Sequence, residues 1–210
     1  MIDRGHDLYE ALQKLDLLRT SPPFWWPKAY SFEVIVGAIL TQNSQWKRVE
    51  ESLENLRNNG LLSLEAIASA PMELLIECIR PSGFFKAKAK NIQSLCQKII
   101  EDFGDFESFT FEVGREWLLE QRGIGPESAD AILCYGCGRA VMVVDKYTQQ
   151  LTAALGREFE DYDELQAWCM DGFRDEEHLA RELALFHGMI VEYMKKYKKG
   201  READIAAIVE

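Results

Sequence analysis

A glycine turn between two predicted helices is the sharpest signal of binding chemistry in this sequence. The segment 118–130 reads LLEQRGIGPESAD, and its first helix ends at Gly123. Gly125 turns the backbone tightly, and Pro126 suits the first position of the next helix, where no amide hydrogen is needed. The glycines allow another chain to approach closely, and the new helix N-terminus directs amide hydrogens toward it, ideally toward a phosphate oxygen. The pattern indicates a helix-hairpin-helix, although an ordinary corner between helices would share it.

Large aromatic rings gather near the N-terminus. Residues 24–27 read Phe-Trp-Trp-Pro, so Trp25, Trp26 and Pro27 are consecutive, and Trp46 follows later. Stacking and cation–π attraction contribute about 0.5–2 kcal/mol for each contact with a cationic ring. Such faces can line a binding pocket, whereas the alternative interpretation is that the tryptophans fill a core.

Composition excludes several classes of protein. The chain has 210 residues, of which 47% are hydrophobic and 28% are charged, so it is globular and long enough for one domain or two small ones. The longest apolar stretch, 34–40, is too short to span a bilayer, and the charged N-terminus is unlike a secretion signal. Five cysteines, an odd number, favour reduced thiols. Cys134 and Cys137 form a CxxC pattern inside an apolar run, but no second pair lies at ligand spacing, so packed thiols are favoured over a zinc site. We expect a cytoplasmic protein.

The net charge of −11 argues against a nucleic-acid partner, but the charges are unevenly distributed. Residues 80–100 carry five basic side chains and no acidic one, and residues 193–201 repeat that bias. Acidic side chains gather instead in residues 158–177. The basic segments therefore suit a polyanion, although ordinary solvated helix faces would look the same.

Apolar residues recur at intervals of three and four along most of the chain, which predicts a mainly helical protein. Glycine and proline residues separate the periodic segments. Residues 140–144 read as a short buried strand or an extended linker. The predicted helices span residues 7–18, 31–40, 46–58, 63–68, 71–79, 86–103, 110–121, 126–137, 147–155, 163–173 and 178–199.

A second motif lies twenty residues after Gly125, where the apolar run 141–144 leads into Asp145. The hairpin and this V-D motif together resemble the helix-hairpin-helix superfamily of DNA glycosylases, the group that contains endonuclease III. Three more segments resemble that family in the expected order: SFEVIVGAILTQNS at 31–44, RPSGFFKAKA at 80–89, and F-H-G at 186–188. The resemblance covers most of residues 31–188.

The resemblance implies an all-α, two-lobed fold with the catalytic cleft between the lobes. A helical core of residues 30–138 would hold the hairpin, and residues 1–29 would join 139–210 in the second lobe. The partner would be double-stranded DNA containing alkylated bases, and we expect a monomer used at the bacterial nucleoid. The hairpin would share a monovalent cation with DNA. The iron–sulfur cluster of some members is expected to be absent, because no cysteine follows Cys169.

Departures from the family pattern refine the expected activity. Bifunctional members carry a Schiff-base lysine two residues after the second hairpin glycine, where this chain has Glu127. A carboxylate cannot form a Schiff base, and Lys146 is more suited to phosphate or solvent. The sequence is most similar to the branch called 3-methyladenine DNA glycosylase III, which implies release of alkylated purines without strand cleavage. A glycosylase for a mismatched or oxidised base, a non-catalytic DNA-binding module and a protein-binding scaffold are the alternatives.

The resemblance also assigns roles to individual residues. Asp145 would stabilise the positive charge that develops on the sugar and orient the attacking water, although its simplest role is to cap the helix that begins at Tyr147. Glu127 would join the aromatic residues in the base pocket. Gln42 would insert into the gap that the extruded base leaves. The residues expected to contact the DNA backbone are Lys86, Lys88, Gly123, Gly125 and Lys146.

Overall fold

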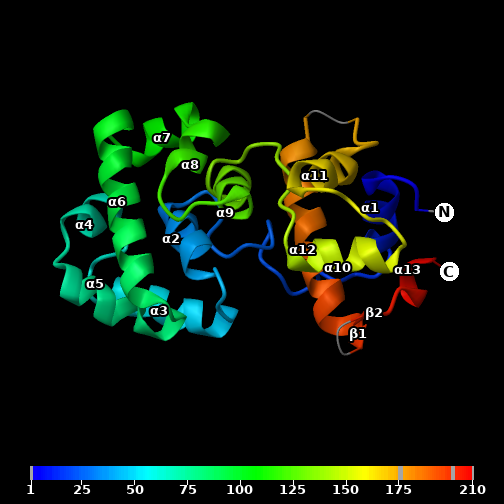
Figure 1. The fold of residues 1–210 in the computed structure, drawn as a ribbon, viewed down its shortest axis with the longest axis horizontal. Helices are drawn as coiled ribbons and strands as arrows, with labels where there is room; N and C mark the ends of the chain where they lie inside the picture. The colour runs from blue at the N-terminus through cyan, green and yellow to red at the C-terminus, as the bar shows by residue number, and fades with distance from the viewer. Residues whose placement is uncertain (1, 175–176, 200–201, 210) are drawn as a thin grey trace. The chain divides into compact units, whose positions relative to one another are not determined.

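The structure, a computed structural model, describes residues 2–174, 177–199 and 202–209. The chain forms two compact units, which Figure 1 shows as separate groups of helices. The central unit is Lys28–Cys137, and the terminal unit combines Met1–Pro27 with Gly138–Glu210. Within the described ranges the only strands are β1 (Lys198–Lys199) and β2 (Glu202–Ala203), an antiparallel pair, so the all-helical prediction is confirmed apart from this short pairing.

The central unit is built around one fully buried helix. In α2 (Phe32–Leu40), all seven residues from Val34 to Leu40 are buried, because α3, α6, α9 and η2 pack around it. A helix that is apolar on every side is stable only when neighbours cover it completely. The other elements of this unit are α3 (Trp46–Asn58), α4 (Leu64–Ser69), α5 (Met72–Ile79), the 3-10 turn η1 (Arg80–Ser82), α6 (Phe85–Phe103), α7 (Phe106–Glu112), α8 (Arg115–Glu120), α9 (Pro126–Ala131) and the π turn η2 (Ile132–Gly136).

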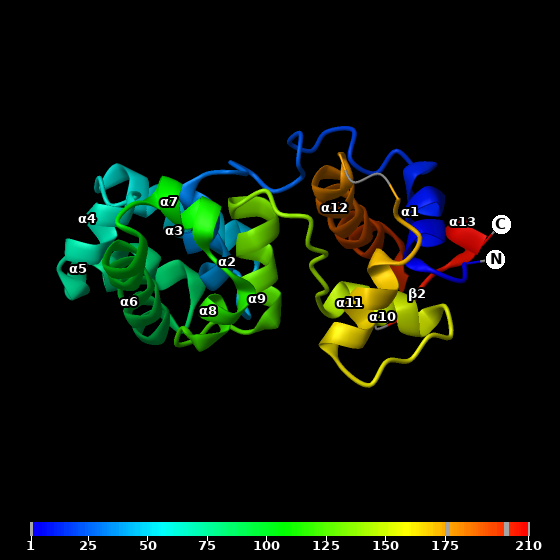
Figure 2. The same cartoon turned by 90° about the horizontal axis from the view of Figure 1, so that it is seen from above.

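The terminal unit joins the two ends of the chain around a long helix. Its elements are α1 (Gly5–Gln13), α10 (Lys146–Ala154), α11 (Tyr162–Met170), α12 (Leu179–Tyr197) and α13 (Ala206–Val209). Helix α12 packs against α1 and α10, and Figure 2 shows α13 beside α1. Leu183, Phe186, Ile190 and Tyr193 of α12 are completely buried in the shared core. The N-terminal segment is thus part of this core.

Several predicted boundaries differ from the structure. The predicted helix 110–121 is two helices, because Gly114 interrupts it and Asp105 starts α7 by accepting a hydrogen bond from the Ser108 amide. The predicted helix 126–137 changes from α9 to the π turn at Ile132. Of the two alternatives for residues 140–144, the structure supports the linker, because the segment forms neither a strand nor a helix. The acidic segment 158–177 and the basic segment 193–201 extend in part beyond the described residues.

Candidate functional site

Asp145 begins helix α10 in the terminal unit, directly after three buried residues of the apolar run. Its Oδ1 accepts hydrogen bonds from the Thr148 amide at 2.8 Å and from the Thr148 hydroxyl at 3.0 Å. The capping role suggested by the sequence is therefore real. It uses one carboxylate oxygen, while Oδ2 lies 3.6 Å from Nε2 of His187. The arrangement fixes the direction of the carboxylate from two sides.

The environment of Asp145 keeps its side chain ionised. Burial raises the pKa of this carboxyl, but the contact with His187, followed by the hydrogen bonds from the amide and hydroxyl of Thr148, outweighs burial. The pKa consequently lies below its usual value of 3.8. At neutral pH the site therefore holds a negative charge that can stabilise a cation.

His187 connects the carboxylate to an aromatic ring. Its side chain is almost completely buried on α12, and its ring meets that of Trp25 edge to face, with centroids 5.1 Å apart. Trp25 has a left-handed backbone with φ of 63°, which costs about 1–3 kcal/mol for a residue of this size. A hydrogen bond of 3.0 Å from Nε1 to Glu192, which also binds Lys195, helps to hold the ring in place. The surrounding contacts thus maintain a strained aromatic residue beside the Asp145–His187 pair.

Gly188 allows this packing. A Cβ atom added to Gly188 would lie 2.4 Å from Cγ of Trp25, closer than real side chains come. The rings of Trp26 and Trp25 meet edge to face, with centroids 6.2 Å apart. Trp26 is only 8% exposed, so most of its surface packs in the core. Pro27 is half-buried at the end of the same segment.

Substitution Gly188→Ala is expected to push Trp25 out of position. Overpacking of this kind costs about 1–3 kcal/mol, so any reaction that uses the Trp25 face should slow by roughly tenfold. The measurements are the rate of base release and the thermal unfolding midpoint. Gly136→Ala is the matched control, because its added Cβ would meet Val34 at an ordinary 3.6 Å. Equal effects of the two substitutions would show that the contact with Trp25 is unimportant.

The predicted hairpin is present in the central unit between α8 and α9. Gly123 has a φ of 79°, and a Cβ there would lie 2.1 Å from Nδ2 of Asn91, so only glycine fits. Nothing lies within 4 Å of a Cβ built on Gly125, which leaves this face of the turn open to another molecule. Pro126 begins α9 as predicted, and Glu127 follows it as an exposed residue of the first turn.

Gln42 is tied to the hairpin. Its side-chain Nε2 donates to the Gly123 carbonyl and to the Ser128 hydroxyl, each at 2.9 Å. Asn43 follows with a left-handed φ of 51°, which asparagine tolerates well. In this arrangement Gln42 braces the loop between α2 and α3 against the hairpin. Insertion into a duplex would require it to give up both bonds.

The prediction that Lys88 contacts a phosphate is wrong. This side chain is 3% exposed, and its Nζ donates to the carbonyls of Leu40 and Ser82, each at 2.9 Å. It lies on the buried face of α6, whereas Lys86 is exposed and remains available to an anion. Lys146 is also exposed, at the first position of α10.

Phe84 is a candidate that the sequence did not reveal as a site residue. It is 72% exposed and has a left-handed backbone with φ of 48°, directly after Gly83 with φ of 69°. An exposed phenylalanine gives up the benefit of burial, and its backbone conformation adds about 1–3 kcal/mol of strain. Strain of this kind gathers at ligand contacts. The sequence signal that could have identified Phe84 as a site residue is the Gly-Phe pair before a helix.

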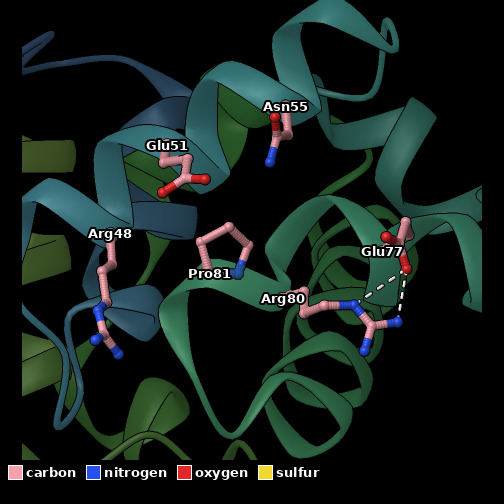
Figure 3. A pocket seen from close by; sticks show the side chains of 6 residues that line it. All are labelled: Arg48, Glu51, Asn55, Glu77, Arg80 and Pro81. Carbon is pink, nitrogen blue, oxygen red and sulfur yellow. Dashed lines mark hydrogen bonds and ion pairs between the residues drawn. The ribbon is translucent and has the colours of Figure 1, made fainter.

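A hollow of about 480 Å³ opens on the central unit. Figure 3 shows the side chains that line it. Its walls carry charges of both signs, and Arg80 and Glu77 pair across 2.6 Å. No predicted site residue lines it. The lining residues are Arg48, Glu51 and Asn55 of α3, Glu77 of α5, and Arg80 and Pro81 of η1.

Asp145, Trp25, Trp26 and Pro27 all belong to the terminal unit, where Trp25 and Asp145 both contact His187. The other predicted pocket residues, Trp46 and Glu127, belong to the central unit with the hairpin and Gln42. Among the described residues, no group of three histidine, cysteine or acidic side chains could hold a metal ion. No described helix is both long and apolar enough to cross a membrane.

Comparison with known proteins identifies the family. Residues 36–174 match the model of the HhH-GPD superfamily base excision DNA repair proteins. A Methanocaldococcus jannaschii protein named as a DNA repair glycosylase, MJ1434, is 37% identical over 183 residues, which are 82% of this chain and 80% of that protein. This match and the family model together cover most of the described chain.

Solved structures agree with this assignment. The H. pylori 3-methyladenine DNA glycosylase MagIII, solved with 1,N6-ethenoadenine, is 45% identical, with a TM-score of 0.88 over 93% of this chain and 99% of that one. An endonuclease III–DNA complex shares the fold at 18% identity, with a TM-score of 0.75 over 95% of this chain and 90% of that one. This chain therefore belongs to the HhH-GPD superfamily and is a DNA glycosylase of base excision repair.

Proposed function

We propose that this glycosylase releases purines alkylated on a ring nitrogen, chiefly 3-methyladenine, and leaves the abasic strand uncut. One observation carries the proposal: the ionised Asp145 and the strained Trp25 ring both contact the buried His187. The same contacts thus position a negative charge and an aromatic face. The identity of 45% with the H. pylori 3-methyladenine glycosylase supports the same substrate class.

The chemistry of the alkylated base explains why its release needs few catalytic side chains. A purine alkylated on a ring nitrogen carries a positive charge and leaves as a neutral molecule, so its bond to the sugar is already weakened. No strong general acid is needed. Asp145 stabilises the positive charge that develops on the anomeric carbon and orients the attacking water. Its lowered pKa keeps it ionised for this role.

The aromatic residues supply the preference for a cationic base. Stacking on Trp25 with cation–π attraction contributes about 0.5–2 kcal/mol for a charged ring and less for a neutral one. Trp26 supports this ring from the core side. Trp46 and Glu127 stay predicted pocket residues of the central unit.

The side chains at positions 127 and 146 favour simple hydrolysis. Glu127 occupies the position at which bifunctional members carry the Schiff-base lysine, and a carboxylate cannot take over that reaction. Lys146 follows Asp145 but is exposed at the start of α10, where it suits a phosphate contact. The described residues also offer no cysteine group that would hold an iron–sulfur cluster.

The central unit supplies further contacts to duplex DNA. The hairpin glycines and Lys86 hold phosphates, and these contacts carry no sequence information. Extrusion of the base leaves a gap in the stack, at a cost of a few kcal/mol. The exposed Phe84 is suited to fill that gap, while Gln42 keeps the neighbouring loop in place.

The test is the identity of the base that the protein releases. Methylated duplex DNA is incubated with the protein, and the freed bases are separated and identified. Duplexes containing uracil, a G·T mismatch or 8-oxoguanine are run in parallel. We expect free 3-methyladenine and at least roughly a hundredfold slower release from the neutral lesions. Preferential release of a neutral base would contradict the cationic pocket.

A further inference from the structure

The buried lysine of α6 links two loops that face DNA in the proposed function. The Leu40 carbonyl ends α2, directly before the loop that carries Gln42. The Ser82 carbonyl ends η1, directly before Gly83 and the exposed Phe84. Gln42 extends the connection to the hairpin. Two side chains thus connect three segments of the central unit by hydrogen bonds, in addition to the packing of their helices.

We infer that Lys88 is a positioning residue for DNA binding: its buried ammonium group holds the Gln42 and Phe84 loops in one arrangement, and it must stay protonated for full DNA affinity. The inference rests on the proposed contact of these loops with DNA. Lys88 itself touches no phosphate.

Burial of the Lys88 ammonium group costs free energy, which favours a functional role for its charge. A buried ammonium ion loses its hydration, and among the described residues Lys88 has no ion-pair partner, only two neutral carbonyls. Burial lowers its pKa to about 8 from 10.5. An apolar side chain of similar length would fill the space without that cost, but it would leave both carbonyls without their donor.

DNA should favour the protonated form. A positive charge beneath the Gln42 and Phe84 loops is attracted to the polyanion, and charged donors make stronger bonds to the carbonyls. Binding of DNA therefore raises the pKa of Lys88, and affinity falls as the pH rises through about 8. Unfolding does not explain such a fall, because a lysine whose folded pKa is lowered stabilises the protein as it loses its proton.

Other charged groups on the packed elements are accounted for. Burial alone explains the lowered pKa of Lys88, and none of these groups contributes to it. On α2, Glu33 is paired with Arg57, and on η1, Arg80 is paired with Glu77. The remaining charged side chains on these elements, and on α4 and α7, which also pack against α6, are exposed: Lys47, Arg48, Glu50, Glu51 and Glu54 of α3, Glu65 of α4, Glu73 of α5, Lys86, Lys90, Lys98, Glu101 and Asp102 of α6, and Glu107 and Glu112 of α7.

The test measures the dissociation constant of an undamaged duplex at pH 7, 8 and 9 and at constant ionic strength. The wild-type protein should lose roughly fivefold to tenfold in affinity between pH 7 and 9, as expected for one coupled proton. Lys88→Met should bind about tenfold more weakly at pH 7 and show little further change. Lys88→Arg, which stays charged, should retain its affinity at pH 9.

The control is Lys90→Met, two residues along the same helix and exposed. It should shift affinity slightly and keep the wild-type pH dependence. Thermal unfolding at each pH verifies the fold of every variant. If Lys88→Met does not fold, the comparison of Lys88→Arg with wild type decides the question. Parallel pH profiles for these two proteins would overturn the inference, and because no lesion is present, a failure would leave the proposed base specificity untouched.

Discussion

Replacing Asp145 with asparagine is expected to reduce base release by at least about a hundredfold while the protein stays folded. The substitution removes the negative charge that stabilises the sugar cation, and charge stabilisation or proton transfer of this kind contributes about 10²–10⁴ in rate. Asparagine caps helices as well as aspartate, so α10 should begin at the same place. Single-turnover release from methylated duplex, with thermal unfolding in parallel, measures both effects.

Asp161→Asn provides the matched control. Asp161 caps α11 by accepting a hydrogen bond from the Glu164 amide at 2.8 Å, as Asp145 does for α10, but it has no contact with His187 among those described. This control should release base at the wild-type rate. If Asp145→Asn keeps more than about a third of the activity, the carboxylate is only a helix cap and the proposed mechanism is wrong.

Substitution Gly5→Ala is expected to destabilise the terminal unit by about 3 kcal/mol. A Cβ on Gly5 would lie 1.9 Å from the Cys169 carbonyl oxygen of α11, and a backbone atom cannot move aside as a side chain can. The start of α1 would have to separate from α11, which also threatens the hydrogen bond from the His6 amide to Asp171. Because the unit joins both ends of the chain, this loss affects the whole core around α12.

Thermal or denaturant unfolding measures the effect of Gly5→Ala, and a midpoint lower by roughly 6–12 °C corresponds to that loss. Gly114→Ala is the control, since nothing lies within 4 Å of an added Cβ and its backbone needs no left-handed conformation. A Gly5→Ala midpoint within about 2 °C of the control would show that α1 does not pack on α11 as described.

Local sequence signals predicted the elements more successfully than the contacts. Helix α3 begins and ends where the sequence predicted, since Gly60 follows it and its amphipathic pattern is regular. The predicted helix 110–121 failed because Gly114 was not treated as a break, although Asp105 is a typical helix start. The π turn at Ile132 depends on packing around α2, which no local pattern encodes.

In the candidate site too, short motifs predicted some features, and long-range contacts decided the others. The hairpin and Asp145 follow from short motifs, and the structure contains both. The burial of Lys88 was predictable in principle, because it shares the α6 face of Ile92, Leu95 and Ile99. The contact of Trp25 with His187 was not, since it joins residues 162 positions apart through a left-handed turn. Contacts between residues so far apart in the sequence depend on how the folded core packs.

One reaction tests the central claim most directly. Methylated duplex DNA is incubated with the purified protein, and part of the mixture is treated with borohydride to trap any covalent intermediate. The account predicts free 3-methyladenine, a strand that breaks only after alkali, and no trapped protein–DNA product. Strand cleavage without alkali together with a trapped product would contradict it, because a lysine would then perform the chemistry assigned here to Asp145 and water.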